Sequence, residues 1–75
     1  MLAATGTAVA GNADLPPLAR YTACIEQARV DPKNAFEDSI AWRDMGGGAP
    51  AEHCAASALI TLGLFKDAAA RLEDI

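Results

Sequence analysis

Apolar residues recur every three or four positions through most of this chain, and such spacing predicts helices. The first stretch covers residues 18–30, and Pro17 suits its first turn because the missing N–H needs no partner there. Asp31-Pro32 ends the stretch, since the residue before a proline is driven out of the helical region. One face of this predicted helix carries Leu18, Tyr21, Ile25 and Ala28.

A second helix is expected to begin at Asn34, which forms a capping-box pattern with Glu37. The run Gly46-Gly47-Gly48 ends it, because glycine accepts the left-handed backbone of a helix C-terminus. Near its end, Trp42 and Met45 are either core residues packed against the next helix or exposed anchors for a partner. We favour the core.

Two further helices are expected in the second half of the chain. The third covers about residues 50–62, opens at Pro50 and ends at Gly63. In the fourth, Asp67 and Arg71 are expected to pair on the exposed face. Its apolar seam consists of Phe65, Ala68, Leu72 and Ile75. Residues 15–75 therefore predict an all-α fold of two stacked antiparallel helical hairpins, about four helices in all, truncated at the C-terminus.

Residues 1–14 lack the alternation of a helix or a strand, and we expect them to form a disordered leader. Ala8-Val9-Ala10 fits the small-x-small pattern at which secretory signal peptides are cleaved, although no basic segment precedes it. Two interpretations stay open: the end of a signal peptide that starts upstream, or an alanine-rich disordered leader. We favour the first, and with it a periplasmic or secreted protein; a cytoplasmic one is the alternative.

Composition limits what such a chain can do. Hydrophobic residues make up 52% of it, but much of this fraction is alanine, so the core is small and its stability depends on further support. The net charge is −4 and the basic residues are scattered, which argues against binding to nucleic acid or to an anionic membrane. No apolar run reaches the length of about 18 residues that a transmembrane helix needs.

An internal repeat relates the two halves of the chain. Ala35 and Ala68 each follow the turn at the head of the second helix of a hairpin, and they are 33 residues apart. Periods of this length mark arrays of helical hairpins, in which each unit buries its apolar face against its neighbours.

The second hairpin is the part of the chain that resembles a known family. Residues 51–75 are similar to a tetratricopeptide repeat, whose turn reads L-G-x-[YF]-x-x-A with a large apolar residue one turn later. The matching positions are Leu62, Gly63, Phe65, Ala68 and Leu72, with small residues at Ala56 and Ala58. The first half matches loosely, and an alternative phase makes residues 18–30 the closing helix of a preceding repeat. The resemblance implies a right-handed array of hairpins that serves as a non-catalytic scaffold for protein–protein interaction.

Cys24 and Cys54 are the first candidates for chemistry. In a stacked array the first helices of successive hairpins lie side by side, so the two thiols can meet. A disulfide between them would stabilise the fold by roughly 3 kcal/mol. The alternative is two buried free cysteines that behave as small apolar residues. We favour the disulfide.

His53 next to Cys54 does not make a metal site or a catalytic pair. Adjacent residues on a helix point about 100° apart, and no CxxC motif or second histidine completes a ligand shell. The same geometry keeps the imidazole from activating the thiol. We expect no metal, no cofactor and no enzymatic activity.

The expected function is to hold a segment of a protein or peptide partner on the concave surface lined by the first and third helices. The candidate contacts are Tyr21, Glu26, His53 and Ser57. The alternative is a small helical oligomerisation module that self-associates through Phe65, Leu72 and Ile75. A thiol-redox protein that uses the two cysteines comes third.

Overall fold

The computed structural model describes residues 15–75, and within this range the chain forms helices and no strand. The elements are α2 (Pro17–Val30), α3 (Pro32–Trp42), the π-helical turn η1 (Arg43–Gly47), α4 (Gly48–Thr61) and α5 (Phe65–Glu73). The all-α prediction is therefore confirmed for this part of the chain. The predicted leader, residues 1–14, lies outside the described residues.

The expected count of about four separate helices is corrected. Helical hydrogen bonding continues without a gap over residues 32–61, so the described chain has three helical segments and the middle one is bent. At the bend, Met45 leaves the helical region and Gly46 adopts a φ of 97°. The glycine run thus turns the backbone inside a wide, still hydrogen-bonded loop instead of ending the helix cleanly.

The connection between α2 and α3 is the single residue Asp31. The expected capping box at Asn34 and Glu37 is wrong, because α3 already begins at Pro32. Proline at the first helical position has no N–H that would need a cap. Asn34 instead donates a hydrogen bond from Nδ2 to Oδ2 of Asp31 at 2.8 Å. The start of α2 at Pro17 and its end at Val30 agree with the prediction.

Gly63 ends α4, as the sequence predicts. It has a φ of 82°, and its N–H donates to the carbonyl of Ile60 at 2.9 Å. The N–H of Leu64 donates to the carbonyl of Leu59 at 2.9 Å, which completes the hydrogen-bond pair of a Schellman motif. This tight turn reverses the chain into α5.

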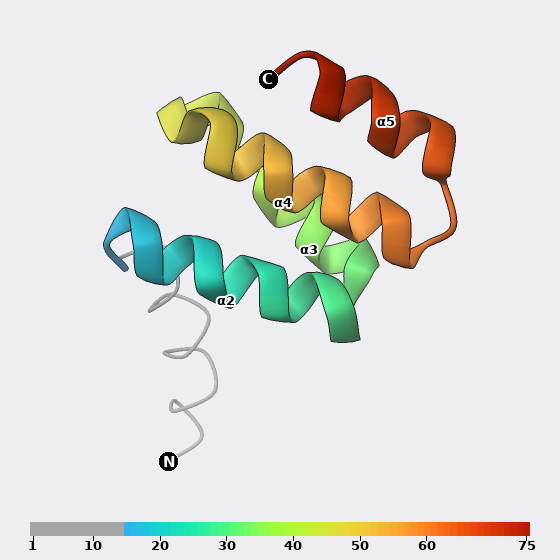
Figure 1. Ribbon diagram of the computed structural model, residues 1–75. Coiled ribbons are helices and arrows are strands. Elements are labelled where there is room, and N and C mark those ends of the chain that lie inside the picture. The colour runs from blue at the N-terminus through green and yellow to red at the C-terminus, as the bar shows by residue number, and fades with distance from the viewer. Residues whose placement is uncertain (1–14) are drawn as a thin grey trace.

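Helix α4 lies at the centre of the fold and packs against α2, α3 and α5, while α2 also packs against α3 (Figure 1). Small side chains fill these contacts, which allows the helix backbones to approach closely. The main core cluster consists of Cys24, Ala28, Ala35, Trp42, Ala51, Cys54 and Ala58. A second cluster of Ala56, Leu59 and Ala68 lies between α4 and α5, with Phe36 of α3 packed against it.

Trp42 is the largest residue of this core. It is buried beside the bend, and the Arg20 guanidinium of α2 lies 4.9 Å from the centre of its ring. Gly47 passes so close that a Cβ there would lie 2.6 Å from Cδ1 of the indole. The core interpretation of Trp42 is therefore confirmed, whereas Met45 is exposed.

Candidate partner-binding groove

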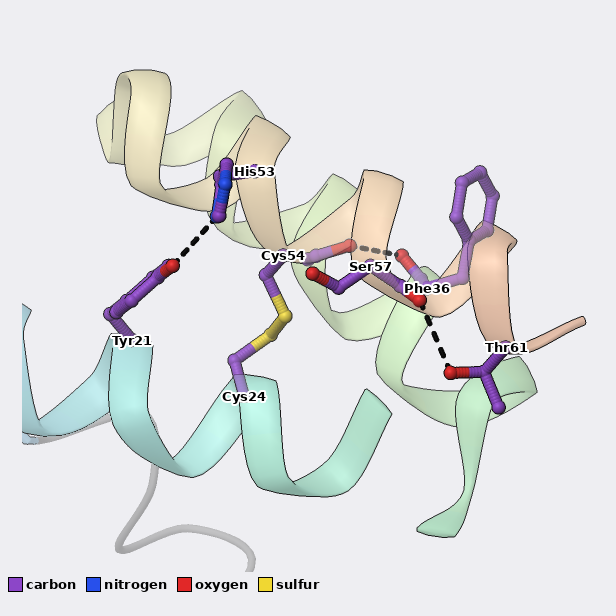
Figure 2. Close-up of a disulfide and its surroundings, with 8 residues drawn as sticks. Tyr21, Cys24, Phe36, His53, Cys54, Ser57 and Thr61 are labelled. Carbon is purple, nitrogen blue, oxygen red and sulfur yellow. Dashed lines mark hydrogen bonds between the residues drawn. A yellow bond between two sulfur atoms is a disulfide. The ribbon is translucent and has the colours of Figure 1, made fainter. Parts of the chain in front are cut away.

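A disulfide joins Cys24 of α2 to Cys54 of α4, as we predicted from the sequence (Figure 2). The two Cα atoms are 6.2 Å apart, within the range that a disulfide spans. Both cysteines are buried. The bond therefore fixes α2 beside α4 from within the core.

Tyr21, one turn before Cys24, meets His53, the residue before Cys54, so the pair lies beside the disulfide on the same two helices (Figure 2). The phenol oxygen lies 2.6 Å from Nδ1 of the imidazole, and the ring centroids are 5.7 Å apart. A neutral imidazole with its proton on Nε2 accepts the phenol proton at Nδ1. Two of the four predicted contact residues are thus brought together.

A groove of about 380 Å³ opens beside this pair, between the N-terminal ends of α2 and α4. Its lining is almost wholly apolar, apart from the phenol and the imidazole. The lining residues are Pro17, Leu18 and Tyr21 of α2, Ala49, Pro50 and His53 of α4, and Ile75 after α5. Leu18 has 77% of its surface exposed, so its side chain is available to a partner.

The other two predicted contacts do not line this groove. Ser57 is half-buried one turn further along α4, and its carbonyl accepts a hydrogen bond from Thr61 Oγ1 at 3.3 Å (Figure 2). Glu26 is exposed and forms an ion pair with Arg29. It lines a second depression on α2, which shares Leu18 with the groove. The structure therefore separates Glu26 from the other candidates.

Sequence reasoning missed the apolar half of the groove. From the sequence, Pro17 and Pro50 predict only the starts of helices, and Leu18 only a position on the apolar face of the first helix. The available signal was that both helices of the predicted concave surface open with proline beside apolar or small residues, which places similar walls at the same end of the fold.

Away from the groove, Glu52 of α4 links two other elements. Its carboxylate accepts hydrogen bonds from Arg71 of α5 at 2.9 Å and from Arg43 of η1 at 3.3 Å. The expected pairing of Arg71 with Asp67 is therefore wrong. Arg71 also lies over the ring of Phe36, 5.1 Å from its centre. One arginine thus ties α5 to both α4 and α3.

These contacts shift the pKa values of the charged groups. Burial raises the pKa of the Glu52 carboxyl, but the hydrogen bonds from Arg71 and Arg43 outweigh it, so this pKa lies below its ordinary value. Hydrogen bonds to Asp44 and Glu52 raise the pKa of Arg43. Glu52 and Arg43 therefore both stay charged at neutral pH.

Within residues 15–75, the structure gathers no group of three or more metal-ligating side chains, and no helix there is long and apolar enough to cross a membrane. Comparisons with known protein families, with curated proteins and with solved structures find no match to this chain. The tetratricopeptide resemblance therefore rests on the residues of the second hairpin.

Proposed function

We propose that this chain is a non-catalytic interaction module that binds a segment of another protein in the groove between α2 and α4. The observation that carries the proposal is the groove itself, an apolar hollow held open between two helices that a disulfide fixes in place. A preformed site of this kind loses little conformational entropy on binding.

The helix neighbours support an array of the tetratricopeptide type. α2 and α4, the first helices of the two hairpins, pack against each other, and each packs against the second helix of its own hairpin. A further contact, between α3 and α4, joins the hairpins. In such an array the surface lined by first helices is the concave one, where the groove lies.

The lining indicates the chemistry of the partner segment. Leu18, Pro17 and Pro50 offer an apolar wall to one or two aliphatic or aromatic side chains. The Tyr21–His53 pair supplies the polar edge, where a backbone carbonyl or N–H of the segment can form a hydrogen bond. A short apolar peptide fits these features better than a charged one.

The disulfide supports an extracytoplasmic location, since such bonds persist in oxidising compartments. It gives less support to the thiol-redox alternative. Exchange with an external thiolate needs access to a sulfur atom, and both cysteines are buried. We therefore assign the bond a structural role.

The test uses peptides selected from a random library on the oxidised chain, followed by calorimetric titration. The variant Leu18→Glu places a charge in the apolar wall, and we expect it to weaken binding at least about tenfold. Val30→Glu is the matched control, because Val30 is 66% exposed at the other end of α2 and lies outside the groove. We expect it to change the Kd by less than about twofold.

Two results would overturn the proposal. One is a library that yields no binder to the oxidised chain. The other is a set of binders that Leu18→Glu and Val30→Glu weaken equally, because those peptides would then bind elsewhere or respond only to charge.

A further inference from the structure

Helix α5 is partnered on one side only. Of the predicted seam, Ala68 alone is buried, against α4, whereas Phe65 is 66% exposed and Leu72 is 41% exposed. The spacing of Phe65, Ala69 and Leu72 by four and three residues puts them on one stripe of the helix. All three residues are exposed, and Phe65 and Leu72 lie three and four residues from the buried Ala68, so the stripe borders the contact between α5 and α4, which lie side by side (Figure 1).

The turn before α5 enlarges the exposed apolar surface. Ile60 at the end of α4 is 48% exposed, and Leu62 and Leu64, in the turn that leads to Phe65, are 43% and 47% exposed. Single exposed apolar residues are ordinary on a protein surface, whereas a larger exposed apolar patch marks an interaction surface.

Two charges along one edge of the stripe indicate what covers it. Lys66 and Glu73 are seven residues apart, so they lie on the same side of α5, one near each end. Both are exposed, and neither takes part in an ion pair among the described residues. Both charges also interact unfavourably with the dipole of α5. The cation Lys66 lies at the positive N-terminal end of the helix, and the anion Glu73 lies at the negative C-terminal end.

We propose that a second copy of this chain docks on α5 in the antiparallel orientation, so that the two α5 stripes form the centre of a symmetric dimer. In this orientation, side chains on the same edge of two facing helices meet end to end. Lys66 of each copy then faces Glu73 of the other. The small residue Ala69 lies near the two-fold axis and allows close approach, while Phe65 packs toward Leu72 of the other copy.

A second copy explains the charges better than an unrelated partner does. The stripe is complementary to itself only when one copy is reversed, as a closed two-fold interface requires. The reversed copy also brings a carboxylate to the positive end of each helix and an ammonium to the negative end. The surface is separate from Leu18 and the α2–α4 groove, so the dimer does not depend on the peptide-binding proposal.

The experiment is sedimentation equilibrium of the oxidised chain over a wide concentration range, with charge-reversed variants. Lys66→Glu or Glu73→Lys alone converts two attractive pairs of the dimer into two repulsive ones. We expect each to raise the dimer Kd by about tenfold. The double variant K66E/E73K should return it to within about threefold of the original value.

The matched controls are Lys33→Glu and Glu37→Lys, which make the same changes of charge on exposed positions of α3. We expect both to leave the Kd unchanged. A mixture of Lys66→Glu and Glu73→Lys should form a heterodimer, since each copy then offers the charge that the other lacks.

Three results would overturn the proposal: a wild-type chain that stays monomeric at every concentration, an assembly that continues to grow beyond the dimer, or a double variant that dimerises no better than the single ones. Circular dichroism of each variant confirms that the helices are intact, so a loss of dimer cannot be mistaken for unfolding.

Discussion

Of the eleven apolar residues buried in the described part of the chain, seven are alanines and two are the disulfide-linked cysteines. Alanine permits close helix packing but removes little apolar surface from water, so such a core contributes a small hydrophobic stabilisation per residue. The link between Cys24 and Cys54 therefore carries a large share of the stability, and the position of α2 beside α4 depends on it.

The first prediction concerns this link. Replacing both cysteines, Cys24→Ala with Cys54→Ala, should lower the free energy of unfolding by roughly 3–4 kcal/mol, because the bond closes a loop of 30 residues. Urea titration followed by circular dichroism measures the change. The wild-type chain with reductant is the control and should show a loss of similar size. A variant as stable as the oxidised wild type would contradict the structural role of the disulfide.

A second prediction at this scale concerns the contact between Gly47 and Trp42. Gly47 has an ordinary helical backbone, with φ −66°, so Gly47→Ala causes no backbone strain. The substitution therefore tests only the steric contact between the new Cβ and Trp42. The added methyl group would displace the indole and cost about 1–3 kcal/mol. Because Trp42 is the single tryptophan, its fluorescence should also shift to longer wavelength.

Gly46→Ala is the matched control for that change. Gly46 has a φ of 97° but open space around its Cβ position, so the substitution strains the backbone by about 1 kcal/mol and leaves the indole in place. If Gly47→Ala and Gly46→Ala shift the fluorescence equally, the close approach of Gly47 is not what positions Trp42.

At the scale of elements, α4 organises the molecule, since every other described helix packs against it. Apolar contact explains its packing with α2 and α3, but α5 buries only Ala68. The ion pairs of Glu52 with Arg43 and Arg71 compensate, because they tie η1 and α5 to the middle of the fold. The orientation of α5, and so the exposure of its apolar stripe, depends on this charged link.

The third prediction tests the link through pH. Glu52→Gln should lower the melting temperature at neutral pH by roughly 2–5 °C. Because the folded-state pKa of Glu52 is below its ordinary value, the stabilisation is fully present above the unfolded-state pKa and is lost as the pH falls through the folded-state pKa. The difference between wild type and variant should therefore shrink as the pH falls below the ordinary pKa of a glutamate carboxyl.

Asp44→Asn is the control for this measurement. Among the described residues Asp44 pairs with Arg43 alone, at an exposed position of η1, so its removal should change the melting temperature little at any pH. A difference between wild type and Glu52→Gln that stays constant from neutral pH into acid would exclude the charged link as its cause.

Part of this fold could be predicted from the sequence, because local signals decide it. Proline fixed the start of α2 at Pro17, and glycine fixed the end of α4 at Gly63. The predicted start of α3 was wrong because two local signals were present. The helix begins at Pro32 and not at the capping box that starts with Asn34. The sequence could not predict that Arg71 pairs with Glu52 and not with Asp67, because this ion pair depends on how α5 packs on α4.

At the scale of the whole molecule, the two surfaces with exposed apolar side chains suit different roles. The groove beside Tyr21 and His53 is a mostly apolar hollow between two helices that the disulfide joins, whereas Phe65 and Leu72 are exposed on α5, where we propose that a second copy docks. A repeat pattern could predict the pairing of Cys24 with Cys54, because it places first helices side by side. It could not predict the groove, whose walls are assembled from α2, α4 and the chain after α5.

The measurement that tests the binding role most directly is an NMR titration of the oxidised chain with a peptide selected from the random library. We expect the amide shifts to change most in the first turns of α2 and α4, around Leu18, Tyr21 and His53, with little change around Glu26 or Val30. Shifts that instead concentrate around Phe65 and Leu72 on α5, and leave the first turns of α2 and α4 unchanged, would contradict a binding site in the groove.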